Sequence, residues 1–99
     1  MIHKNYWDEM LYRSVHIMRN KKEIQMLKKK SGNDIQTLSL EIDIIKLENI
    51  ITELKLQAIE NNLNSIKTKL DIIRDRLNDI ERRTKQLYID LEKDTEEVL

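Results

Sequence analysis

The residues that could do acid–base or metal chemistry are few and far apart. His3 and His16 are the two histidines, and they lie 13 residues apart, which corresponds to about 20 Å along one helix. That distance is too long for the two imidazoles to share a metal ion. The carboxylates Asp71, Asp75 and Asp79 repeat every four residues, a spacing typical of a charged, solvated helix face. The sequence therefore predicts neither a catalytic nor a metal-binding site.

Other kinds of chemistry are limited by the composition. Cysteine is absent and glycine occurs once, which excludes a thiol nucleophile, a cysteine metal site and a glycine-rich phosphate loop. Apolar runs reach three residues at most, too short for a transmembrane helix or the core of a secretion signal. We expect a protein that is not an enzyme, that has no cofactor and no small-molecule substrate, and that is soluble and cytoplasmic.

The side chains that could contact an anionic partner are gathered in residues 1–30. This segment has a net charge of +5, while residues 31–99 have −5, and the two cancel over the chain. The cations of interest are Arg13, Arg19, Lys21, Lys22, Lys28, Lys29 and Lys30. They could bind nucleic acid or an anionic membrane surface. A helix end and a solvated helix face would explain the same charges, and we favour that interpretation.

The elements that position these residues are helices, because the chain has no proline and 36% of its residues are charged. Lys28, Lys29 and Lys30 suit the end of a helix, and Gly32 suits the left-handed residue that follows it. Asn33 or Asp34 then caps a second helix. The sequence predicts a basic amphipathic helix over 1–30, a turn over 31–34 and a long helix over 35–99.

A heptad repeat runs through the predicted long helix from Ile35 to Val98 without a skipped residue. Of its 19 a and d positions, 15 are apolar, and Asn49 and Thr52 form a polar layer near the start. A repeat held this long predicts a left-handed coiled coil between chains. The residues expected at the oligomer interface are Ile35, Leu38, Ile42, Ile45, Asn49, Leu56, Ile59, Leu63, Ile66, Leu70, Ile73, Leu77, Ile80, Leu87 and Leu91.

A second apolar stripe follows the back of residues 35–58, where a simple coiled coil would be polar. A helix that is apolar on nearly all sides must be covered on nearly all sides, so this stretch needs a further neighbour. The first helix is the candidate, since the short turn favours an antiparallel hairpin. The residues expected in this hairpin interface are Trp7, Met10, Leu11, Met18, Leu40, Ile44, Leu47, Ile51 and Leu54.

Together these patterns predict an all-α fold, in which a short basic helix folds on the first half of a long helix that oligomerises. Leu at a and Ile at d favour three or four strands, whereas Asn49 favours two. Charges at the e and g positions slightly favour a parallel arrangement. We expect a structural scaffold that assembles with itself or with a related coiled-coil chain in a rod of roughly 95 Å. The alternative is an oligomeric module that binds nucleic acid or membrane through the basic helix.

Overall fold

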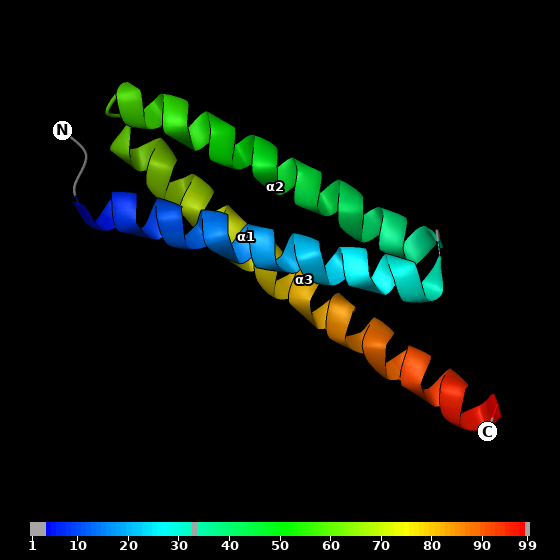
Figure 1. Cartoon of the computed structure of the whole chain (residues 1–99). Helices are drawn as coiled ribbons and strands as arrows, with labels where there is room; N and C mark the ends of the chain where they lie inside the picture. Colours follow the sequence, from blue (N-terminus) through cyan, green and yellow to red (C-terminus); the bar gives the residue numbers. More distant parts are fainter. Residues whose placement is uncertain (1–3, 33, 99) are drawn as a thin grey trace.

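The fold is a bundle of three α-helices, as seen in a computed structural model that describes residues 4–32 and 34–98 (Figure 1). Helix α1 spans Lys4–Ser31, α2 spans Ile35–Ile59 and α3 spans Leu63–Val98. Each helix packs against both of the others, and the molecule measures 59 × 20 × 16 Å. The predicted all-α fold is confirmed. His3, Asn33 and Leu99 lie outside the described residues.

The turn between α1 and α2 is built by Gly32, Asp34 and Thr37. Gly32 has a φ of 76°, and its amide donates to the carbonyl of Lys28 at 2.8 Å, which ends α1. Asp34 caps α2 by accepting a hydrogen bond from the amide of Thr37 at 2.8 Å. This bond is the largest cause that lowers the pKa of the Asp34 carboxyl. The fully buried Thr37 hydroxyl donates back to Asp34, so the turn is closed from both sides.

The predicted long helix over residues 35–99 is interrupted, and this corrects the expectation of a rod. Asn61 has a φ of 59°, in the left-handed region that asparagine tolerates better than most residues. Asn62 then accepts a hydrogen bond from the amide of Ser65 at 3.3 Å at the start of α3. The chain reverses here because α3 can bury its apolar stripe against α1 and α2. The heptad pattern alone could not show whether α3 packs against helices of its own chain or against another chain.

The core is formed by one stripe from each helix. Helix α1 contributes Met10, Ile17, Ile24 and Leu27, all buried. Helix α2 contributes the back stripe, which we define as Leu40, Ile44, Leu47, Ile51, Leu54 and Ala58. Helix α3 contributes the central part of its heptad positions, namely Ile66, Leu70, Ile73, Leu77 and Ile80. Burial of each large aliphatic side chain stabilises the fold by about 1.5–3 kcal/mol.

The membership of the predicted hairpin interface also needs correction on the α1 side. Met10 is buried against the back stripe, but Trp7, Leu11 and Met18 are exposed. The buried residues Ile17 and Ile24 lie on a different face of the helix, set by the 3.6-residue period, from Leu11 and Met18. The apolar side of α1 is therefore wider than the side that α2 and α3 cover.

Candidate protein-interaction surface

Helix α2 has a second apolar stripe that nothing in the bundle covers. We define this outer stripe by its heptad a and d positions: Ile35, Leu38, Ile42, Ile45, Asn49, Thr52, Leu56 and Ile59. Its six large apolar side chains are between 42% and 85% exposed. The back stripe of the same helix is buried, so α2 has one apolar face in the core and another in solvent.

Ion pairs on both edges of α2 fix the direction in which the outer stripe faces. Toward α1, Lys28 lies 3.2 Å from Glu41 and Lys21 lies 3.4 Å from Glu48.

Toward α3, the guanidinium of Arg83 pairs with Asp43, and the ammonium of Lys69 lies 3.4 Å from Glu53. Because α1 and α3 occupy the two edges that flank the back stripe, the outer stripe faces away from both helices. Neither helix can cover it without leaving the core.

Helix α1 also has exposed apolar side chains, at the same levels along the bundle as α2. The Lys21–Glu48 and Lys28–Glu41 pairs show that α1 and α2 run antiparallel, and the same register brings Met18 level with Ile51. Leu11 is then level with Ala58, and its own side chain is 67% exposed. The outer faces of α1 and α2 thus both have exposed apolar residues over the same length of the bundle. Large exposed apolar surfaces of this kind mark interaction sites in folded proteins.

The remaining residues expected at the oligomer interface lie in α3, and most are buried inside the chain. Ile66, Leu70, Ile73, Leu77 and Ile80 are each at most 1% exposed, because they contact α1 and α2. Leu63 is exposed, whereas Leu87 and Leu91 are half-buried. In this form of the chain, the part of the predicted interface that is accessible to a partner lies mainly in α2, together with Leu63 at the start of α3.

The bundle brings together a polar cluster that sequence reasoning missed. Nε2 of His16 donates to the carboxylate of Glu81, and the buried Asn20 donates to the same carboxylate at 3.3 Å. Burial alone would raise the pKa of Glu81, but the hydrogen bonds from Asn20 and His16 outweigh it, and the pKa is lowered. The cluster joins α1 to α3. Its partners are more than 60 residues apart, so no local pattern reveals it.

The cations of α1 do not converge on one site. Lys21 and Lys28 pair with acids of α2, as described above, and Lys30 lies over the ring of Tyr88 at 5.3 Å. Arg13 lies over the ring of the neighbouring Tyr12 at 5.1 Å. Three further cations are exposed: Arg19, Lys22 and Lys29. Part of the positive charge is thus neutralised within the bundle.

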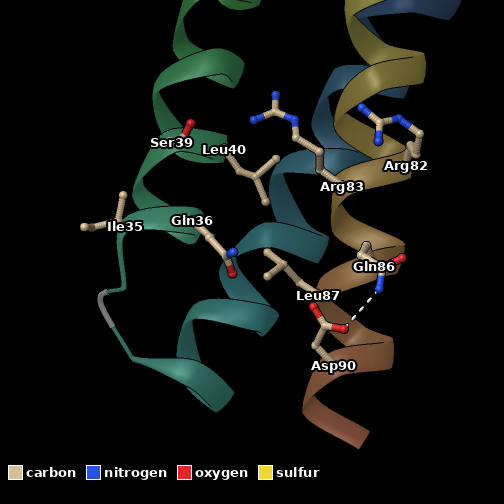
Figure 2. A pocket seen from close by; sticks show the side chains of 9 residues that line it. All are labelled: Ile35, Gln36, Ser39, Leu40, Arg82, Arg83, Gln86, Leu87 and Asp90. Atoms are coloured by element: carbon tan, nitrogen blue, oxygen red, sulfur yellow. Dashed lines mark hydrogen bonds between the residues drawn. The ribbon is translucent and has the colours of Figure 1, made fainter. Parts of the chain in front are cut away.

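A hollow of about 310 Å³ lies between the start of α2 and the second half of α3 (Figure 2). Its apolar lining comes from Ile35, Leu40 and Leu87, and Arg83 crosses it toward α2. Arg83 is held by Asp43 and by Asp79, whose Oδ2 lies 2.9 Å from Nε. The hydrogen bond and charge from Arg82, together with those of Arg83, lower the pKa of Asp79 despite its partial burial. These charged groups pair with one another, and their arrangement is that of a structural ion-pair network.

Comparisons with known proteins do not supply a family for this chain. No protein-family model matches it, and neither characterised proteins nor solved structures gave a match. Among the described residues, no group of three or more histidines and carboxylates is placed to hold a metal ion. Within the same ranges, no helix is both long and apolar enough to span a membrane.

Proposed function

We propose that the protein is a structural assembly module that associates with copies of itself, or with a related helical chain, through the outer stripe of α2. The observation that carries this proposal is the exposure of six large apolar side chains in heptad spacing on a helix whose other face is already buried. A monomeric bundle gains nothing from such a stripe. A second helix with a matching stripe would cover it through knobs-into-holes packing.

The size of the surface supports this proposal. The outer faces of α1 and α2 are about 37 Å long and about two helix diameters wide, which gives about 700 Å². A standard protein–protein interface covers roughly 800 Å² on each partner. The available surface is therefore comparable with what a stable complex requires.

The test is the molar mass of the full chain in solution, measured by light scattering coupled to size exclusion. We expect a mass above that of one chain, and a return to one chain in the double variant Ile42→Glu/Ile45→Glu, because charges would be buried in the interface. Circular dichroism should show unchanged helicity. A control with the same chemistry is Ile72→Glu/Ile89→Glu, which alters two exposed isoleucines of α3 and should keep the assembly. If both variants keep the mass of the parent chain, assembly through the outer stripe is wrong.

A second candidate function is the binding of an anionic partner by α1. The exposure of Arg19, Lys22 and Lys29 favours it, because these cations are accessible from solvent. The pairing of Lys21 and Lys28 with acids of α2 weakens it, because fewer cations are left for phosphates. Binding of nucleic acid or anionic vesicles that is lost in Arg19→Ala/Lys22→Ala/Lys29→Ala, while the assembly persists, would support this second function.

A further inference from the structure

We propose that the turn at residues 60–62 is a hinge, and that opening it joins α2 and α3 into one helix that pairs in parallel with a second copy of this chain. This inference rests on the proposed self-assembly and adds to it a second form of the protein. In the closed form, which is the structure described above, the outer stripe is exposed and the α3 stripe is buried. In the open form both stripes form a single seam along α2 and α3.

The first argument is the phase of the heptad across the turn. Ile59 occupies a d position before the turn, and Leu63 and Ile66 occupy the next a and d positions after it, with no residue added or removed. Helices joined by a permanent turn need share no phase, so chance would give this agreement about one time in seven. A continuous helix requires the agreement, because a single inserted residue would rotate the α3 stripe away from the outer stripe.

The second argument is the small conformational change that opening requires. Glu60 already has helical backbone angles, with φ of −80° and ψ of −6°. Asn61 has a left-handed φ, so its backbone angles must change for the helix to continue through the turn. The turn residues 60–62 include neither proline nor glycine, so nothing in their chemistry forbids a helix.

The third argument identifies what covers the open seam. In a parallel pair, Glu41 would face Lys46 of the other copy, and Lys55 would face Glu60. These are opposite charges at g and e positions, which guide coiled-coil pairing, whereas Glu48 and Glu53 would oppose each other. Asn49 would meet its own copy, the arrangement in which a single polar a residue fixes register.

Opening exchanges one set of apolar contacts for another. The α3 stripe leaves the core and enters the seam between the two copies, together with the outer stripe, which the closed form leaves in solvent. Helix α1 can stay on the back stripe, held by the Lys21–Glu48 and Lys28–Glu41 pairs. The Asp43–Arg83 and Lys69–Glu53 pairs between α2 and α3 are lost. Because the seam forms between chains, high protein concentration should favour the open form.

The experiment measures the distance between α2 and α3 within one chain. Ser39 and Gln86 line the same hollow in the closed form, and the chain has no cysteine of its own, so Ser39→Cys/Gln86→Cys gives a unique pair of dye sites. In the open form about 70 Å would separate them along the helix. Labelled chains are diluted in an excess of unlabelled chains, so that single-molecule energy transfer reports distances within a chain. Transfer should be high at low concentration and low in the assembled fraction.

Two variants of the turn sharpen the test. Asn61→Ala/Asn62→Ala favours helix at the hinge and should increase the low-transfer fraction severalfold, with a longest dimension near 95 Å in X-ray scattering. Asn61→Gly favours the left-handed conformation and should keep transfer high. Assembly with high transfer in both the parent chain and the double alanine variant would overturn the hinge and leave the proposed function intact. Assembly that persists in the Ile42→Glu/Ile45→Glu variant would overturn the proposed function instead.

Discussion

At the scale of single residues, the bundle depends on polar side chains that join helices far apart in the sequence. Glu81 is the central example, because two residues of α1 donate hydrogen bonds to its carboxylate. Tyr88 follows Glu81 by seven residues in α3, and its hydroxyl donates a hydrogen bond to the carboxylate of Glu23 in α1 at 3.3 Å. Burial together with the charge of Glu23 raises the pKa of the Tyr88 phenol. Such contacts set the register of α3 against α1, a property that apolar packing alone specifies weakly.

We predict that Glu81→Gln destabilises the bundle in a pH-dependent way. The folded state lowers the pKa of Glu81 below its ordinary value of 4.5, so its contribution is present above that value and is lost as pH falls through the lower, folded pKa. Urea unfolding at pH 7 should show the variant less stable by about 1 kcal/mol. The difference from the parent chain should shrink below pH 4.5.

The control for this prediction is Glu92→Gln, which changes an exposed carboxylate on the same helix. It should leave stability nearly unchanged at both pH values. An equal effect of the two substitutions would mean that general charge repulsion, and not the contacts to His16 and Asn20, accounts for the change.

At the scale of helices, much of the fold could be predicted from the sequence. The pattern gave the helical class, the first turn near Gly32 and the need for a second neighbour along the back stripe. The reversal at Asn61 could not be predicted, because a heptad stripe shows that something covers a helix without showing which chain supplies the cover. The polar cluster around Glu81 was also missed, since its partners become neighbours only when α3 folds back.

We predict a large difference between two leucine-to-alanine substitutions that distinguish the core from the outer surface. Leu77 is fully buried in the core by α1 and α2, so Leu77→Ala should destabilise the bundle by about 2–5 kcal/mol. Leu11→Ala, at an exposed site of α1, should change stability by about 0.5 kcal/mol or less. Thermal or urea unfolding of dilute samples measures both. Comparable losses in the two variants would show that α1 turns its Leu11 face toward the core.

At the scale of the whole molecule, the charges are arranged to hold the bundle together more than to attract an outside partner. Part of the positive charge of α1 faces acids of α2, and the Lys21–Glu48 and Lys28–Glu41 pairs join the two helices. Exposed pairs of this kind contribute little individually, roughly 0.2–1 kcal/mol each. The exposed apolar surface is the larger feature of the exterior, and it governs how the molecule should respond to its surroundings.

We predict that the proposed self-association is nearly insensitive to salt between 50 and 200 mM, because apolar contacts would carry it and salt screens only charges. Sedimentation velocity at both salt concentrations measures the assembled fraction. Phosphate binding by six or more cations would instead weaken on the order of a thousandfold over this range. A steep loss of assembly with salt would mean that the cations of α1, and not the outer stripe, hold the copies together.

The odd number of helices in the described bundle determines where the start of α1 and the end of α3 lie. Because α1 and α3 run the same way, the start of α1 and the end of α3 lie at opposite poles of a molecule 59 Å long (Figure 1). Anything fused before α1 would leave from one pole, and anything fused after α3 from the other. Closed bundles aligned in parallel would gather the starts of all their α1 helices at one end and the ends of all their α3 helices at the other. An assembly of this kind would be a polar spacer, able to keep two kinds of attached cargo apart while concentrating each kind.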